Sequence, residues 1–361
     1  MLRPTRLDTP NRDGRIAHRG TDPRPPGPAR LRSTVLACLF ALPIVCACVG
    51  SATAESAPLR LPSRDGTLTG ILDRTAEGVL TWSLERTGRV VVAESPLGIT
   101  VDGVDLGRRA SPGTPAARNR DETYPWRGVK RTAVERCREY VVPMRSGDAD
   151  TPWQLEVRVF EDGFAFRYRI PGTGRRRIQG ESTAWTLAAG TPVWFQTNTG
   201  DYEGAYQRRA VESVPTTNSN DRLARPVHLG PPVTVELPEG GFMLLTEANL
   251  RRYGGMTLRP TGTARLLAAF EDDPGGFELE GEILSPWRVT VVADDLDALV
   301  NADVVPNLAD APDPRLFSAG ARTDWIRPGR ALITWCVFGN DGAQWPLQKW
   351  FVDRCAALRC E

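Results

Sequence analysis

The sequence predicts a mainly β protein in which an antiparallel β-sandwich precedes a shorter segment with one strand and one helix. The 361 residues are enough for two domains. The 34 Gly, 30 Pro and 10 Trp are typical of many short strands joined by turns. After residue 54, apolar and polar residues alternate with a period of two, which is the pattern of half-buried strands.

The charge of the chain is unevenly distributed. The formal net charge is +1, and residues 1–54 carry eight Arg and three Asp, so the remaining residues have a net charge of −4. A mildly acidic chain has no general electrostatic attraction for nucleic acid. We therefore expect no nucleic-acid partner.

Residues 1–54 have the pattern of a secretory signal. A basic stretch from Arg3 to Arg32 precedes an apolar run from Val35 to Val49, and Ala52-Thr53-Ala54 matches an A-x-A cleavage site. The apolar run is shorter than the ~20 residues that span a bilayer. We expect cleavage after Ala54, export to the periplasm or the extracellular space, and no membrane association afterwards. An uncleaved N-terminal anchor is the alternative.

The clearest local signal in the sandwich region is a hairpin. Apolar and charged residues alternate on both sides of Asp162-Gly163, in the segment QLEVRVFEDGFAFRYR at 154–169. An Asp-Gly pair between two alternating runs is the strongest short-range hairpin signal. The sequence therefore predicts two paired strands that turn at this dipeptide.

Further strands of the sandwich follow from the same alternation. They are expected at 68–72, 79–84, 90–93, 233–237, 241–246, 257–259, 265–270 and 287–292. Ser111–Glu122 and Thr216–Arg225 lack apolar periodicity and are expected to be long loops, which are often functional in compact domains. Asp294–Val300 has the pattern of a short helix. We assign residues 55–305 to the sandwich domain.

A Pro-rich linker is expected at 306–330, and the pattern changes after it. Ala331–Phe338 (ALITWCVF) is a continuous apolar run, as expected of a strand buried on both faces. From Leu347 to Leu358 the apolar residues fall on one helical stripe. A parallel strand–helix unit needs neighbouring strands. We therefore expect residues 331–361 to be the start of a second domain that is cut short.

Motifs for nucleophilic, nucleotide and zinc chemistry are absent from the sequence. His228 is the sole histidine after the predicted signal, and no G-x-S-x-G, P-loop, H-E-x-x-H or C-x-x-C motif accompanies it. We interpret His228 as a loop histidine. Glu203 lies in GDYEGAY between Tyr202 and Tyr206, where a loop carboxylate offers oxygen to a hard cation such as calcium. A solvated turn is the alternative for this loop.

Five stretches, taken in order, resemble the N-terminal part of glycoside hydrolase family 97. They are SPLG at 95–98 with its sequel at 101–106, EVRVFEDGFAFRY at 156–168, TEANLRRYGGM at 246–256, SPWRVTVVAD at 285–294 and TDWIRPGR at 323–330. The resemblance extends from about residue 59 to the C-terminus. It implies an N-terminal β-super-sandwich followed by the first strand and helix of a truncated (β/α)8 barrel.

The resemblance also implies a chemistry. Members of the family are exo-acting α-glucosidases or α-galactosidases that use calcium, and their catalytic carboxylates lie on later barrel strands. We therefore expect no catalytic residue in this chain. The resemblance places Glu203 at the position of the sandwich carboxylate that binds the calcium, with Tyr206 as a nearby aromatic residue.

Three functions are consistent with these patterns. The first is the N-terminal, carbohydrate-associated part of an exported, calcium-dependent α-glycosidase that acts on α-linked oligosaccharides, truncated and inactive alone. The second is a non-catalytic carbohydrate-binding β-sandwich protein. The third is a secreted scaffold whose barrel is encoded by a neighbouring gene. The apolar strand and helix expected after residue 330 favour the first, because a binding module would end near Asp294 without exposing them.

Overall fold

The computed structural model describes residues 57–126, 130–147, 149–200, 202–218, 222–311, 313, 315–316 and 329–360. The predicted signal lies outside these residues. Within them the strands form three sheets, and the strand pairings are antiparallel throughout. The predicted mainly β fold is confirmed.

The first sheet has the strand order β1-β2-β3-β4-β13-β19-β18. Its first four strands are successive hairpin partners, in agreement with the alternation of the sequence. The bounds are β1 (Leu59–Pro62), β2 (Leu68–Arg74), β3 (Leu80–Arg86), β4 (Arg89–Pro96), β13 (Ala184–Thr186), β19 (Arg265–Ala269) and β18 (Thr257–Pro260).

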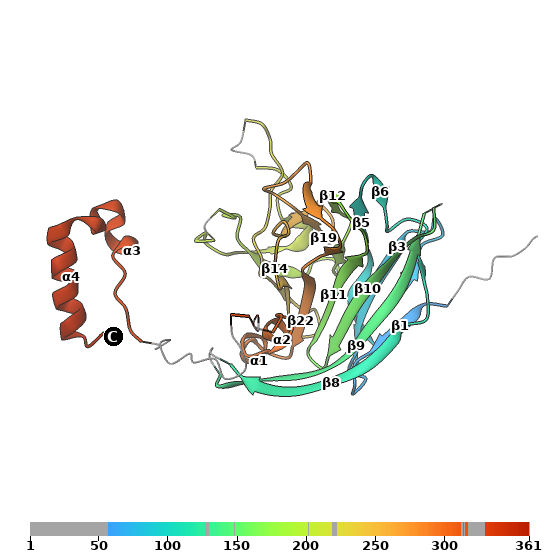
Figure 1. Ribbon diagram of the computed structural model, residues 1–361, viewed down its shortest axis with the longest axis horizontal. Coiled ribbons are helices and arrows are strands. Elements are labelled where there is room, and N and C mark those ends of the chain that lie inside the picture. Colours follow the sequence, from blue (N-terminus) through green and yellow to red (C-terminus); the bar gives the residue numbers. More distant parts are fainter. Residues whose placement is uncertain are drawn as a thin grey trace, which may run out of the picture. The chain divides into compact units, whose positions relative to one another are not determined.

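The second sheet has the order β15-β14-β16-β17-β22-β11-β10-β9-β7, with β8 also paired to β9 and β21 to β11. Figure 1 shows its long strands β8, β9, β10 and β11 curving together. The bounds are β15 (Gln207–Ala210), β14 (Pro192–Phe195), β16 (Val233–Glu236), β17 (Phe242–Ala248), β22 (Trp287–Ala293), β11 (Gly163–Ile170), β10 (Thr151–Phe160), β9 (Thr132–Ser146), β7 (Ser111–Pro112), β8 (Ala116–Pro125) and β21 (Ile283–Leu284). The hairpin predicted at Asp162-Gly163 is β10–β11.

A small third sheet and several short helices complete the described chain. The sheet has the order β20-β12-β5-β6, with bounds β20 (Phe277–Glu280), β12 (Arg175–Glu181), β5 (Ile99–Val101) and β6 (Val104–Asp105). The helices are η1 (Val211–Ser213), α1 (Leu296–Val300), α2 (Val304–Asn307), α3 (Trp335–Phe338), η2 (Gly339–Ala343) and α4 (Trp345–Ala357). In the described part of the chain, no helix has the length and apolar character needed to cross a bilayer.

Aromatic side chains from the first and second sheets fill the space between them. Trp82 of β3 stacks on Phe164 of β11, with ring centroids 5.4 Å apart, and meets Trp185 of β13 edge-on at 6.1 Å. The Trp82 Nε1 donates to the Ala184 carbonyl at 3.0 Å, so the buried indole N–H has a partner. These contacts show that the two sheets are the layers of a sandwich.

The other face of the second sheet carries a smaller apolar cluster. Trp287, Val289 and Val291 of β22 pack there with Leu299 of α1 and Val304 of α2. The short helices thus cover β22 on one face while the first sheet covers the other. This double cover explains why all seven residues of the strand are buried.

Residues Ser111–Glu122 are not the loop that the sequence predicts, because they form β7 and most of β8. Arg118 and Arg120 of β8 bond to Glu139 and Glu135 of β9 at 2.6 and 2.7 Å. Cross-strand ion pairs stabilise this edge strand in place of an apolar face. A search for apolar periodicity therefore misses it.

The strand predicted at Ala331–Phe338 is wrong. Residues 329–334 are irregular, and the rest of the apolar run forms α3. A buried strand needs neighbouring strands for its backbone groups, and none of the three sheets of the described residues includes residues 331–338. The helix predicted at 347–358 is confirmed as α4. That these residues begin a (β/α)8 barrel stays a prediction.

Candidate functional site

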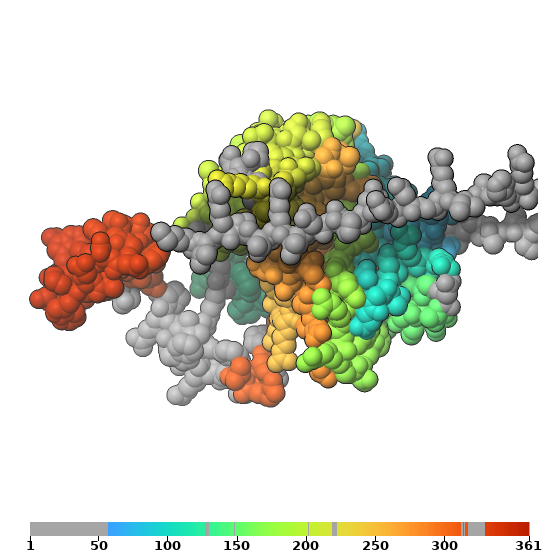
Figure 2. All heavy atoms as spheres, turned by 90° about the horizontal axis from the view of Figure 1, so that it is seen from above, coloured from blue at the N-terminus to red at the C-terminus, as the bar shows by residue number. Residues whose placement is uncertain are grey.

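The loop between β14 and β15 carries Glu203, the residue that the sequence predicts as a metal ligand. The two strands pair up to Phe195 and Gln207, so the loop is a hairpin connection at the β15 edge of the second sheet. Glu203 lies exposed on it, and the rings of Tyr202 and Tyr206 are each 49% exposed. Figure 2 shows the yellow-green atoms of this part of the chain gathered in one lobe. The loop thus carries an exposed carboxylate flanked along the sequence by two half-exposed tyrosines.

A complete metal site is not formed around Glu203. The described residues contain no cluster of three or more His, Cys, Asp and Glu side chains that could hold a metal ion. Calcium takes six to eight oxygen ligands, so one carboxylate of this chain does not fit the ion by itself. The role of Glu203 as a ligand stays a prediction.

His228 lines two clefts of about 520 and 490 Å³, which also share Pro226 and Glu271. Both volumes are within the range of small-molecule sites. The Nδ1 of His228 lies 2.7 Å from the hydroxyl of Thr257, and that hydroxyl donates to the Ala269 carbonyl at 3.2 Å. Burial lowers the pKa of His228 below the usual 6.5. His228 is thus a neutral histidine held by a structural hydrogen bond.

A buried arginine on β22 connects three strands beside the larger of these clefts. The Nε and Nη2 of Arg288 donate to Glu181 of β12 at 3.0 and 2.5 Å, and its Nη1 donates to Glu247 of β17 at 2.7 Å. The hydroxyl of Tyr253 donates to Glu181 at 3.2 Å. The side chains of Arg288 and Glu181 are fully buried. The guanidinium therefore holds the second and third sheets together.

Burial and Arg288 act in opposite directions on the acids of this network. Burial raises the pKa of Glu247, and the charge of Arg288 counters part of that effect. Burial also raises the pKa of Tyr253 well above its usual value, so its hydroxyl remains a donor. Glu181 lines the 520 Å³ cleft, but its oxygens are engaged by Arg288 and Tyr253. The network therefore contributes Glu181 to the wall of the cleft, with both of its carboxylates already paired.

This network is not among the sites expected from the sequence. The available signal was a single Arg within the otherwise apolar strand WRVTVVA, because a buried arginine requires carboxylate partners. Those partners, Glu181 and Glu247, lie 107 and 41 residues away along the chain. No spacing rule connects residues at such separations.

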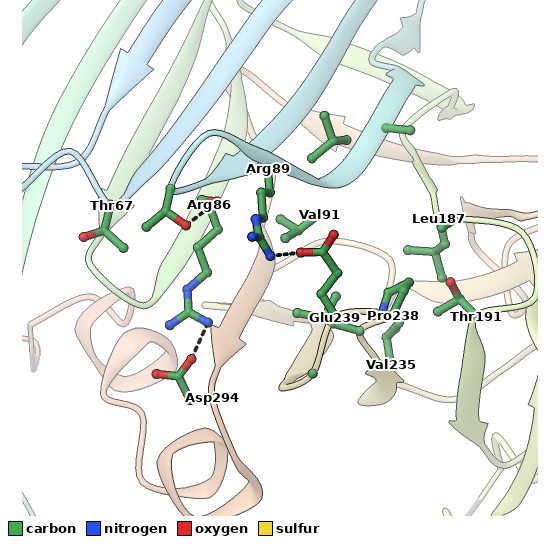
Figure 3. A pocket seen from close by; sticks show the side chains of 16 residues that line it. Thr67, Arg86, Arg89, Val91, Leu187, Thr191, Val235, Pro238, Glu239 and Asp294 are labelled. Carbon is green, nitrogen blue, oxygen red and sulfur yellow. Dashed lines mark hydrogen bonds and ion pairs between the residues drawn. The ribbon is translucent and has the colours of Figure 1, made fainter.

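A third cleft, of about 760 Å³, shares no residue with the Glu203 loop. Figure 3 shows Arg86 pointing toward Asp294 and Arg89 toward Glu239, and the first pair is joined at 2.8 Å. Its lining contains no aromatic ring, and its four charged side chains form these two pairs. The cleft has neither a stacking surface for a sugar nor an available acid or base.

The sequence of the sandwich matches a known family. The family model described as the glycosyl-hydrolase 97 N-terminal domain matches residues 61–311. The chain belongs to glycoside hydrolase family 97. The Glu203 loop, the His228 clefts and the Arg288 network all lie within the matched part of this family 97 domain, and the resemblance noted in the sequence is confirmed.

Two curated family 97 relatives are α-galactosidases by name. "Probable retaining alpha-galactosidase" of Streptomyces bingchenggensis is 31% identical over 294 residues, which are 79% of this chain and 42% of that protein. "Retaining alpha-galactosidase" of Bacteroides thetaiotaomicron is 24% identical over 330 residues, which are 82% of this chain and 48% of that protein. The chain thus spans less than half the length of either relative.

A solved structure shows the same fold. It is a variant of a family 97 enzyme from Pseudoalteromonas sp. strain K8 in complex with panose, with a TM-score of 0.70 and 20% identity. The match covers 83% of this chain and 46% of that one. The sandwich seen here is therefore shared with family 97 enzymes.

Proposed function

We propose that this chain is the N-terminal, carbohydrate-associated part of an exported α-glycosidase of the α-galactosidase type. The observation that carries the proposal is the Glu203 loop, where an exposed carboxylate is flanked along the sequence by two half-exposed tyrosines. The names of both curated relatives support a galactoside as the substrate class. The relative in complex with panose supports an oligosaccharide as the partner.

The proposal includes a calcium ion whose ligands come from this chain and from a second domain. Glu203 would supply one carboxylate, and because the described residues form no fuller cluster, the other oxygens would come from a second domain. By itself the chain would then bind calcium weakly.

The chain is also proposed to be inactive alone. Glycoside hydrolysis uses two carboxyl groups on either side of the scissile bond. Glu181 and Glu247 come together in the described residues, but both bind Arg288, and Glu181 is fully buried. Neither carboxylate is available to a sugar.

A hydrolysis assay tests this part of the proposal. The purified full chain should not cleave p-nitrophenyl α-galactoside or p-nitrophenyl α-glucoside, with or without calcium. Turnover that persists through purification and is lost when a carboxylate of this chain is replaced would overturn it.

Terbium luminescence tests the metal ligand, because terbium replaces calcium and nearby tyrosine rings sensitise its emission. We expect a weak signal that calcium displaces, and Glu203→Gln should remove it. Glu94→Gln, at an exposed position of β4, is the matched control and should leave it intact. An equal signal from wild type and Glu203→Gln would exclude Glu203 as the ligand.

A non-catalytic carbohydrate-binding protein is the second candidate. The half-exposed rings of Tyr202 and Tyr206 favour it, since aromatic faces bind sugars without any need for a catalytic acid. Calcium dependence separates the two candidates. Terbium binding that depends on Glu203 supports the glycosidase part, whereas sugar binding without any metal binding supports the second candidate.

Export is proposed from the pattern of residues 1–54. Amino-terminal sequencing of protein recovered from the periplasm or the culture medium should begin at Glu55. An unprocessed product that stays in the cytoplasm would overturn this part of the proposal.

A further inference from the structure

Gln196 is a buried amide without a hydrogen-bond partner. It follows β14 directly, its side chain is 0% exposed, and both Oε1 and Nε2 lack a partner within the described residues. An amide left unbonded in the interior is destabilising, so an unpaired group of this kind calls for an explanation such as an absent ligand. The backbone at this point is well held, because Gly230 N donates to the Gln196 carbonyl at 3.1 Å.

Two glycines make room for this amide. A Cβ atom on Gly204 would lie 2.9 Å from the Oε1 of Gln196, and one on Gly230 would lie 2.3 Å from its Nε2. Any larger residue at either place would displace the amide. The two glycines thus let the backbone pack directly against a polar group that bonds to nothing else in the described residues.

Tyr202 covers the amide on the side of Gly230. A Cβ on Gly230 would lie 2.8 Å from the Cε1 of the tyrosine ring, so the ring rests directly over that glycine. Tyr202 has φ +61°, a left-handed conformation that is unfavourable for a tyrosine. The residue is nevertheless half-exposed, and its ring packs against the same glycine as the Gln196 amide.

The charges around Tyr202 decide which kind of ligand suits the place. After burial, the acids Glu247, Glu271 and Asp272 are the causes that raise the pKa of Tyr202. Of these, Glu247 is paired with Arg288, and the other two disfavour an anionic ligand. A neutral diol fits, because a glutamine amide accepts a hydrogen bond at Oε1 and donates one at Nε2.

We infer that Gln196 binds two neighbouring hydroxyl groups of a sugar, and that Tyr202 is a movable cover that shifts from Gly230 onto the face of the sugar. The inference rests on the proposed function, which supplies galactosides as the ligand class. It adds a specificity-determining residue next to the Glu203 loop. A site that bonds a hydroxyl through a buried polar group discriminates strongly against a ligand that lacks it.

Titration of the full chain with methyl α-galactopyranoside tests the inference. Gln196→Met keeps the length of the side chain but removes both polar atoms, so affinity should fall at least about tenfold, which equals ~1.4 kcal/mol. The melting temperature should stay the same or rise, because the buried unpaired amide is gone. Gln154→Met is the control, because it makes the same replacement at a half-buried glutamine on β10, outside the Glu203 loop. This variant should keep wild-type affinity.

Gly230→Ala provides a second variant. Its methyl group would occupy the space beside Nε2, so sugar binding should also be lost. If Gln196→Met does not fold, Gly230→Ala decides the question. Wild-type affinity in a folded Gln196→Met, or in Gly230→Ala, overturns the inference and leaves the proposed function standing. No binding of the sugar by the wild-type chain also overturns the inference, whereas the proposed function is tested separately by terbium binding that depends on Glu203.

Discussion

Arg288 and Glu181 form a bidentate ion pair in which both side chains are fully buried, with Nη2 2.5 Å from Oε1 and Nε 3.0 Å from Oε2. Glu247 takes the remaining side of the guanidinium at 2.7 Å. Removing one partner of a buried pair leaves the other charge uncompensated in the interior. Loss of the arginine is therefore expected to destabilise the sandwich.

Arg288→Met should destabilise the chain by about 3–5 kcal/mol. The free energy of unfolding from urea titration measures the effect. Arg208→Met is the matched control, because Arg208 pairs with Glu236 at the surface, where an ion pair contributes only about 0–1 kcal/mol. Equal losses in the two variants would contradict a special role for the buried pair.

Gly70→Ala should also destabilise the sandwich. A Cβ at Gly70 of β2 would lie 2.1 Å from Cε2 of Phe164, whose ring is stacked on Trp82 and has no room to retreat. Overpacking of this kind typically costs about 1–3 kcal/mol. Thermal unfolding measures it, with Gly275→Ala as the control, because the nearest atom there is 3.8 Å away. An unchanged melting temperature in Gly70→Ala would show that the two sheets are packed differently.

His228 should make stability depend on pH. Burial holds its folded pKa below 6.5, so the unfolded chain binds the proton more readily. Its contribution is complete above about pH 6.5 and is lost as the pH falls through that value toward the folded pKa. The free energy of unfolding should therefore decline from pH 7 to pH 5 by less in His228→Asn than in wild type. Identical slopes in the two proteins would contradict a lowered pKa.

Deleting residues 331–361 should leave the melting temperature of the sandwich unchanged and improve solubility. None of the described residues 329–360 belongs to either apolar core cluster, and Trp335, Val337 and Trp345 are more than half exposed. Exposed apolar surface of this extent promotes association. Differential scanning calorimetry and light scattering on both chains check the two expectations. Unfolding of the shortened chain would show that the segment is an integral part of the domain.

Patterns that are local in the sequence predicted much of the fold. The Asp162-Gly163 hairpin follows from turn chemistry and alternation within 16 residues, and the structure confirms it as β10–β11. The family 97 motifs are likewise short segments, and the match over residues 61–311 includes four of the five, while TDWIRPGR at 323–330 lies beyond it. Short-range signals succeed here because a strand with one buried face must alternate whatever its neighbours are.

The tertiary structure alone decided the rest. The partners of Arg288 are 107 and 41 residues away, and β8 is a strand because its arginines meet the glutamates of β9. In the sequence, Gln196 is an ordinary polar residue after the segment that forms β14. Its amide is buried only because Gly204, Gly230 and Tyr202 pack around it in the folded chain. The energy of an ion pair or a hydrogen bond depends on both partners. The pattern of one segment therefore does not reveal a partner that is distant in the sequence. The sequence by itself thus determined the class of fold and the family, whereas the packing of distant segments determined which polar groups are buried, paired or left to bind a ligand.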